Sequence, residues 1–267
     1  MAYGKKRNYR GRKRPYRKRS KAKTKQTVAI VKKVLHSQIE NKQAFKSVSG
    51  IRVTTTMPAS ITTGMYSIIP NLVSSLSGDN SKIGQQVRPL SLKLGMNAII
   101  SNAGGNSTSP IYFDLYVFSI KQIKDSVLFD ADGPANIGKF FRPTLTGVDT
   151  FYEGRVYNWF QNVNKDVINL YHRKRFKMSQ SNVEEAPGTG FDGRWVDNYS
   201  QYSINYNLPL SKHVAKTLKY TNATDEQPNN CALFATLVCT RANADNNPET
   251  FTGGICSFNS CMVYEDA

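Results

Sequence analysis

The sequence predicts an all-β protein, an antiparallel sandwich or barrel of eight or nine strands that follows a disordered basic arm. Three observations lead to this prediction. From Lys46 onward, apolar and polar residues alternate with a period of two. Turn-rich stretches such as NAGGNSTS and DADGPANIG separate the alternating segments, and no internal helix is predicted. Basic residues gather at the N-terminus, where the composition cannot supply a packed core.

The charge distribution divides the chain of 267 residues into two parts. The formal net charge is +17, yet residues 47–267 hold 19 basic and 18 acidic residues. Residues 1–25 hold 13 Lys or Arg and no acid. A neutral body behind a cationic arm disfavours a uniformly basic nucleic-acid-binding domain, because the charge of such a domain would be spread over its folded surface.

Residues 1–25 are predicted to form a disordered arm that binds nucleic acid. Its cations can neutralise phosphates without reading a base sequence, and interleaved tyrosine rings can stack on unpaired bases, which favours single strands. The predicted contacts in the arm are Lys5, Lys6, Arg7, Arg10, Arg12, Lys13, Arg14, Arg17, Lys18, Arg19, Lys21, Lys23, Lys25, Tyr3, Tyr9 and Tyr16. The basic runs also predict a nuclear localisation signal, made of Lys5, Lys6, Arg7, Arg12, Lys13, Arg14, Arg17, Lys18 and Arg19.

Residues 26–45 are predicted to be either a linker or a short amphipathic helix. Val28, Val31, Leu35 and Ile39 recur at spacings of three and four, as on one face of a helix. The same β-branched residues could equally lead straight into the first strand. The folded domain is therefore placed at residues 46–267.

The strands of the folded domain are predicted from alternation and from the turns that bound them. Alternation is clearest where Leu92, Leu94 and Met96 share one face of a strand. In chain order, the predicted strands are 51–57, 89–100, 111–121, 154–161, 166–178, 199–208, 214–220, 231–240 and 254–264.

The sequence does not indicate an enzyme, and no metal or cofactor is expected. Its G-x-G-x-x-G motif, at Gly188, Gly190 and Gly193, follows a polar loop, whereas a dinucleotide site follows a buried strand. The three histidines lie far apart and have no partner at metal-ligand spacing. The four cysteines are interpreted as buried thiols.

A second basic cluster lies within the predicted strand 166–178. Alternation places Ile168, Leu170, Phe176 and Met178 on the face toward the core. Tyr171, Arg173, Arg175 and Lys177 then share the opposite face. An ordinary solvated strand face would have the same pattern. Together with the arm, the pattern favours a nucleic-acid-binding surface that includes Arg173, Arg175 and Lys177.

Several segments give the chain a resemblance to the capsid proteins of small circular single-stranded DNA viruses, the circovirus-like group. An arginine-rich arm precedes a short linker and an all-β body, and VLHSQIENKQAF resembles the Glu-x-Lys segment before the first strand of these proteins. IGQQVRPLSLKLGMNAII is similar to their Gly, Arg-Pro and strand segment. GRVYNWFQNVNKDVINLYHRKRFKM resembles their mid-chain strands, and SINYNLPLSKHVAKTLKYTNATDEQPNNCALFATLV resembles their late segment.

The resemblance implies a single jelly-roll β-sandwich of about eight strands, with two four-stranded sheets in Greek-key order. It also implies self-assembly into the simplest, T=1 icosahedral shell, whose arms hold single-stranded DNA, with RNA as the other option. Expected partners are further copies of the chain, nuclear import receptors and an unidentified host attachment factor. The expected locations are the virion and, during assembly, the host nucleus. The alternative hypothesis is a cellular RNA- or DNA-binding β-domain protein of ribosomal or chromatin type with a basic tail.

Overall fold

The structure is a computed structural model that describes residues 25–28, 30, 41–75, 78–100, 111–143, 150–178, 203–241 and 252–266. The chain divides into two compact units, residues 1–40 and 41–267. In the first unit, residues 25–28 and 30 are helical. The strands of the described residues all belong to the second unit.

One large sheet of the second unit has the strand order β1-β11-β5-β8, and every pairing in it is antiparallel. Strand β9 (Leu218–Lys219) pairs with the start of β5. The four principal strands are β1 (Lys42–Thr54), β11 (Thr252–Asp266), β5 (Gln86–Ile100) and β8 (Ser203–Pro209).

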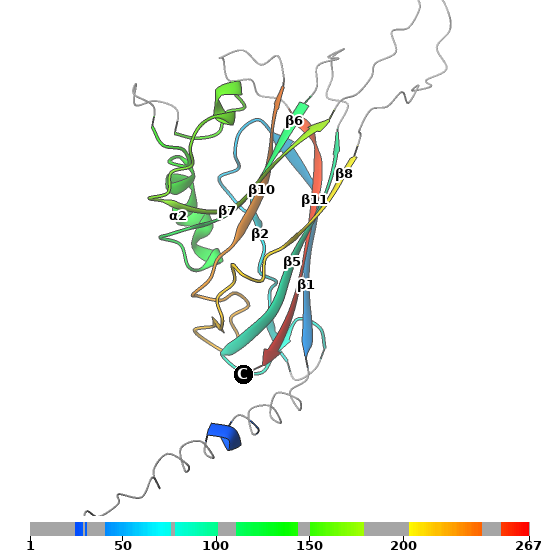
Figure 1. Ribbon diagram of the computed structural model, residues 1–267, viewed down its shortest axis with the longest axis vertical. Coiled ribbons are helices and arrows are strands. Elements are labelled where there is room, and N and C mark those ends of the chain that lie inside the picture. Colours follow the sequence, from blue (N-terminus) through cyan, green and yellow to red (C-terminus); the bar gives the residue numbers. More distant parts are fainter. Residues whose placement is uncertain are drawn as a thin grey trace, which may run out of the picture. The chain divides into compact units, whose positions relative to one another are not determined.

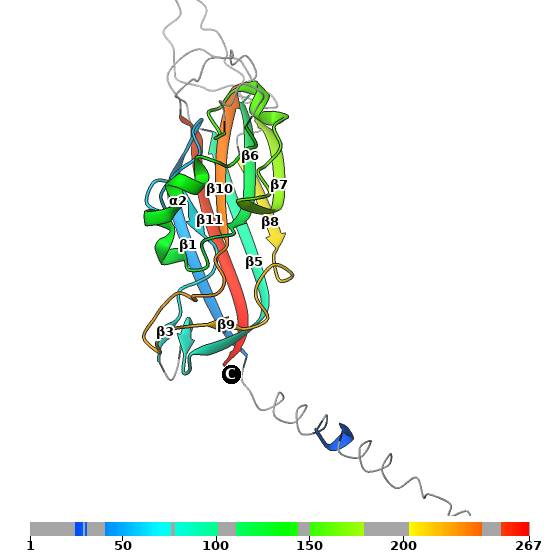
Figure 2. The same ribbon diagram turned by 90° about the vertical axis from the view of Figure 1, so that its left-hand side faces the viewer.

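The second large sheet has the order β2-β10-β6-β7 and is also antiparallel. Figure 2 looks onto this sheet. Its strands are β2 (Tyr66–Ser67), β10 (Phe234–Arg241), β6 (Ile111–Ile120) and β7 (Ile168–Met178). A short parallel pair, β3 (Val73–Ser74) with β4 (Ser81–Lys82), lies outside both sheets.

The strand order is that of a jelly roll. Among the described residues, the eight strands of the two principal paths can be numbered one to eight along the chain. One sheet then reads one, eight, three, six, and the other reads two, seven, four, five. Except for four and five, which follow one another along the chain, neighbouring strands come from distant parts of the sequence, as in two interlocked Greek keys. The predicted single jelly-roll sandwich is confirmed.

The main core lies between the two sheets, which face each other in Figure 1. In β5, Leu92, Leu94, Met96 and Ala98 are buried and alternate with residues that are exposed or half-buried. This is the period-two pattern of a strand with one solvated face. The alternation that predicted β5 is therefore a direct consequence of its place in the sandwich.

A second core covers the opposite face of the β2-β10-β6-β7 sheet. It is formed by the segment between β6 and β7, which we call the β6–β7 insertion (residues 121–167), packing on Tyr116, Phe118 and Phe234. The insertion contains the 3-10 helices η1 (Ser126–Leu128) and η2 (Val156–Trp159) and the helix α2 (Phe129–Ile137). Figures 1 and 2 show α2 on the outer side of this sheet. Because both faces of β6 are covered, eight consecutive residues of that strand, Phe113–Ile120, are buried.

Helix α2 corrects the expectation that the body has no internal helix. Its sequence, FDADGPANI, includes Gly133 and Pro134, which are typical of turns. Phe129 and Ile137 are buried in the second core, and Asp130 lies in the first turn, where a negative charge favours the helix. Burial of the apolar side chains thus outweighs the weak helix propensity of the segment.

Three strand predictions also need correction. The predicted strand 154–161 contains the 3-10 helix η2, and 214–220 is reduced to the two residues of β9. The first strand begins at Lys42, inside the segment assigned to a linker or helix.

All four cysteines are free thiols, of which Cys239 and Cys256 are buried and the other two half-buried. Within the described ranges, no helix has the length and apolarity needed to cross a membrane.

Candidate nucleic-acid interface

The arm residues predicted to bind nucleic acid lie outside the described residues, with one exception. Lys25 is helical and exposed. The predicted contacts from Tyr3 to Lys23, including all residues of the predicted nuclear localisation signal, are not described.

Arg173, Arg175 and Lys177 lie on β7, the edge strand that pairs with β6. From Met178 to His172 the register between β7 and β6 is regular. His172 pairs with Val117, but the next residue of β6, Phe118, pairs with Leu170, so Tyr171 has no partner in the ladder. This is a β-bulge, in which one extra residue reverses the alternation of side chains beyond it. Residues before and after Tyr171 therefore cannot be assigned to faces by counting in twos.

The bulge corrects the predicted faces of β7. Phe176 and Met178 contact the main core as predicted, but Tyr171 also packs there and does not share the face of the arginines. Ile168 is buried in the second core, on the opposite face of the sheet. Leu170, predicted to enter the core, is 37% exposed.

Arg175 is bound within the protein by a buried carboxylate of the neighbouring strand. Its Nε donates to Asp114 Oδ1 at 2.8 Å, and its Nη2 donates to Asp114 Oδ2 at 2.9 Å. Asp114 is completely buried, and the Tyr152 hydroxyl also donates to its Oδ2, at 3.2 Å. The Arg175 guanidinium lies 4.5 Å from the ring centroid of Trp159 in η2. These contacts place Arg175 between the sheet and the β6–β7 insertion.

Arg173 also contacts the insertion. One of its nitrogens donates to the main-chain carbonyls of Asn158 and Trp159, at 3.3 and 3.2 Å. Its guanidinium lies 5.1 Å from the ring centroid of Tyr116. The contact of Arg173 and Arg175 with phosphate stays a prediction. It was inferred from a solvated strand face, whereas in the structure both arginines are hydrogen-bonded within the protein. Lys177 is exposed, as expected for a solvated cation.

Three ionisable side chains beside Asp114 have shifted pKa values. Burial raises the pKa of Tyr152 well above its ordinary value, and the charge of Asp114 raises it further. Burial raises the pKa of Tyr116 in the same way. For Arg175, partial burial would lower the pKa, but the hydrogen bond and the charge of Asp114 outweigh that effect and raise it. The cluster therefore keeps a charged arginine and two neutral phenols around one buried carboxylate.

Gly154 holds the insertion close to Thr55, the residue that directly follows β1. Its φ is +74°, in the left-handed region that favours glycine. A Cβ atom at this position would lie 2.6 Å from the Cβ of Thr55. The chain then enters η2, which begins two residues later. In η2, the carbonyls of Asn158 and Trp159 accept from Arg173, and the Trp159 ring lies beside Arg175.

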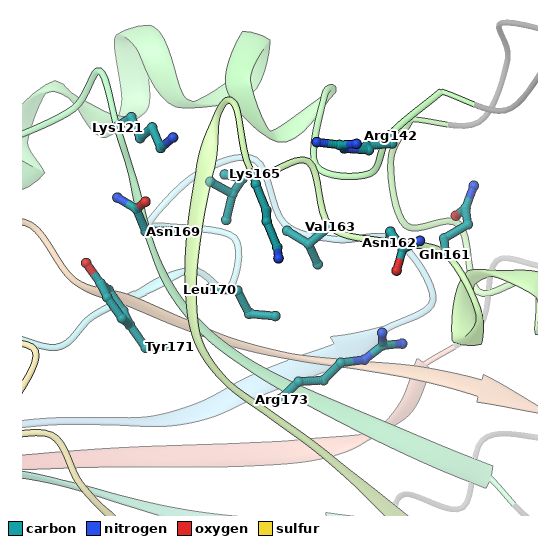
Figure 3. Close-up of a pocket in the computed structure, with 11 residues that line it drawn as sticks. Lys121, Arg142, Gln161, Asn162, Val163, Lys165, Asn169, Leu170, Tyr171 and Arg173 are labelled. Atoms are coloured by element: carbon teal, nitrogen blue, oxygen red, sulfur yellow. The ribbon is translucent and has the colours of Figure 1, made fainter.

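A cavity of about 1050 Å³, which we call the basic cavity, lies between the start of β7 and the β6–β7 insertion. Four cations and no acid line it: Lys121, Arg142, Lys165 and Arg173. Figure 3 shows Lys165 and Arg173 extending into the space beside Val163 and Asn162. The remaining lining residues are the polar Gln161, Asn162, Asn169 and Tyr171 and the apolar Val163, Ile168 and Leu170.

Sequence reasoning missed the basic cavity because its cations are scattered. Lys121, Arg142 and Lys165 stand singly in the sequence, more than twenty residues apart, and only Arg173 belongs to a basic run. Folding of the β6–β7 insertion onto β7 brings them together. The sequence contains no local signal for this arrangement. No cluster of metal-ligating side chains occurs in the part of the chain that the structure describes.

Comparison with known proteins leaves the family open. No protein-family model matches the sequence, and no curated protein is significantly similar to it. Functional inference therefore rests on the topology, the charge distribution and the sites described above.

Proposed function

We propose that this chain is the capsid protein of a small virus with a circular single-stranded DNA genome, similar to the circovirus-like group. In this proposal the jelly-roll body assembles with copies of itself into a T=1 icosahedral shell. The basic arm neutralises the packaged DNA and also serves as a nuclear localisation signal. The body has a structural role and catalyses no reaction.

The observation that carries the proposal is the combination of a jelly-roll body with a charge that is confined to the arm. Residues 1–25 hold 13 cations and no acid, and β1 begins at Lys42, only a short distance along the chain. The folded residues that follow are close to neutral. A cellular protein that binds nucleic acid through its folded surface would place its cations there.

The magnitude of the arm charge fits a packaging role. About 60 copies, as in the smallest closed icosahedral shell, would bring roughly 780 positive charges to one interior. Such an array binds phosphate without base specificity, through the release of counterions. The tyrosines Tyr3, Tyr9 and Tyr16 add stacking on unpaired bases, which favours a single-stranded genome.

The packaging role is tested by deleting residues 2–25 and measuring the nucleic acid content of purified particles. The β-sandwich should keep its melting temperature, because the described core contains no residue of that segment. Particles of the truncated chain should be empty or unstable. Encapsidation at the level of the full chain would exclude the arm as the packaging element.

The import role is tested with a fluorescent reporter fused to residues 1–45. Replacement of Lys5, Lys6 and Arg7 by Ala, or of Arg17, Lys18 and Arg19, should lower the nuclear-to-cytoplasmic ratio in a eukaryotic cell. The matched control replaces Tyr3, Tyr9 and Tyr16 by Ala, which leaves the charge unchanged. A reporter that never accumulates in the nucleus would remove the import role and leave packaging untouched.

A further inference from the structure

The basic cavity combines three kinds of lining that a nucleotide requires. Cations at its rim can hold a phosphate, amide side chains can hydrogen-bond the edge of a base, and an apolar floor can contact the base or sugar. Ligand sites commonly have volumes of about 300–1000 Å³ and place a few polar groups over apolar walls. At about 1050 Å³, the basic cavity has room for a nucleoside phosphate.

The cations of the cavity lack competing acids. Arg142 and Lys165 are exposed, and neither forms an ion pair with another described residue. Arg173 donates to two main-chain carbonyls and has no carboxylate partner in the described ranges. Asp166 follows Lys165 in the sequence but does not line the cavity. These three of the four lining cations, with no acid among the lining residues, suit an anion that carries two negative charges.

The floor of the cavity accounts for an exposed apolar side chain. Leu170 is 37% exposed on a sheet face whose other apolar residues are covered. It lines the cavity together with Val163 and Ile168, both of which are almost fully buried. Gln161, Asn162 and Asn169 supply amide donors and acceptors around this floor. In Figure 3, Leu170 lies between Lys165 and Arg173, so an apolar ring and a phosphate could be contacted together.

We propose that the basic cavity binds a nucleoside phosphate, with the phosphate on Arg142, Lys165 and Arg173 and the base or sugar against Leu170 and Val163. The ligand can be a free nucleotide or one nucleotide unit of a single strand, since both present the same chemistry. None of the described residues that line this site belongs to residues 1–25. The proposal does not depend on assembly into shells or on the packaging role of residues 1–25.

The test measures binding of radiolabelled dAMP to the full chain by equilibrium dialysis. The variant Arg142→Gln/Lys165→Gln removes two exposed rim cations that form no ion pair with another described residue. The matched control, Lys93→Gln/Lys219→Gln, removes the same charge from exposed positions on β5 and β9. Both proteins keep the arm, so any weak binding there contributes equally to the two measurements.

The wild type and the control should show a saturable component, which the Arg142→Gln/Lys165→Gln variant should weaken at least about 10-fold. Deoxyadenosine, which lacks the phosphate, should not compete, and inorganic phosphate should compete more weakly than dAMP. Equal binding by the variant and the control would overturn the proposal. So would competition by deoxyadenosine that matches competition by dAMP.

A second variant tests the shape of the cavity without changing its charge. Leu170→Trp places a large ring on the floor and should abolish the saturable component while leaving the melting temperature nearly unchanged. Retained dAMP binding in Leu170→Trp would contradict the assignment of the base to this floor. Displacement of dAMP by a thymidine decamer, at concentrations that saturate the arm, would identify the ligand as part of a strand. Lack of displacement would identify it as a free nucleotide.

Discussion

Arg175 of β7 and Asp114 of β6 form a two-point ion pair between adjacent strands, with N–O distances of 2.8 and 2.9 Å. The carboxylate is completely buried, and the arginine side chain is 31% exposed. An ion pair of this kind adds little to stability when both partners are present, but removal of one partner leaves a buried charge without compensation. Arg175 therefore belongs to the framework that joins the sheet to the β6–β7 insertion.

Replacement of Arg175 by Gln should destabilise the body by about 2–4 kcal/mol, because the buried Asp114 carboxylate loses both charged hydrogen bonds. Chemical denaturation at pH 7 measures this change. The control is Lys177→Gln, which removes an exposed cation from the same strand and should change the free energy of unfolding by no more than about 0.5 kcal/mol. Equal, small effects of the two substitutions would contradict the framework role of Arg175.

The bulge at Tyr171 predicts opposite sensitivities for two leucines of adjacent strands. Leu170→Ala should cost at most about 1 kcal/mol, because its side chain is already 37% exposed. Leu115→Ala should cost about 2–5 kcal/mol, because it opens a cavity in the main core. Thermal melting of the two variants makes the comparison. A larger loss for Leu170 than for Leu115 would mean that β7 keeps regular alternation through Tyr171.

Lys46 predicts a pH dependence of stability. Burial lowers its pKa from 10.5 to about 8, and its ammonium lies 5.7 Å from the centroid of the Tyr66 ring. Between pH 8 and pH 10.5 the unfolded lysine holds more protons than the folded one, so the contribution of Lys46 to stability rises with pH. Below pH 8 the folded protein carries the full cost of the half-buried charge.

Lys46→Met should therefore be more stable than the wild type at pH 7, and this advantage should shrink by pH 10. Denaturant titrations of both proteins at the two pH values measure the difference in their free energies of unfolding. Other titrating groups affect both proteins equally, so their contributions cancel in this difference. Lys93→Met, which replaces an exposed lysine of β5, is the matched control. A stability advantage of Lys46→Met that is the same at pH 7 and pH 10 would show that Lys46 stays charged in the fold.

Of the strands that the sequence predicted well, β5 and β11 have one solvated face, whereas β6 is covered on both faces. β5 and β11 alternate because their successive residues face the core and the solvent in turn, and that pattern is local. β2 escaped prediction because two residues cannot show a period. Helix α2 escaped because Gly133 and Pro134 indicate a turn, and only the burial of Phe129 and Ile137 by distant residues makes a helix favourable.

The candidate sites depended even more on long-range contacts. The basic run of β7 was visible in the sequence, but the bulge that reverses its faces was not. Arg175 and Asp114 are 61 residues apart, so no local pattern could pair them. The basic cavity likewise needs the folded insertion to bring Arg142 and Lys165 toward Arg173. The charge of the arm, in contrast, can be counted directly from the sequence.

The central claim, self-assembly into a closed shell, is tested most directly by the mass and shape of the purified full chain, measured by light scattering and electron microscopy. The proposal predicts uniform, roughly spherical particles of about 1.8 MDa, for about 60 copies of the 29.9 kDa chain. They should form at near-physiological salt in the presence of single-stranded DNA. A protein that remains a monomer or small oligomer at every concentration, with or without nucleic acid, would contradict the claim and favour a cellular nucleic-acid-binding protein.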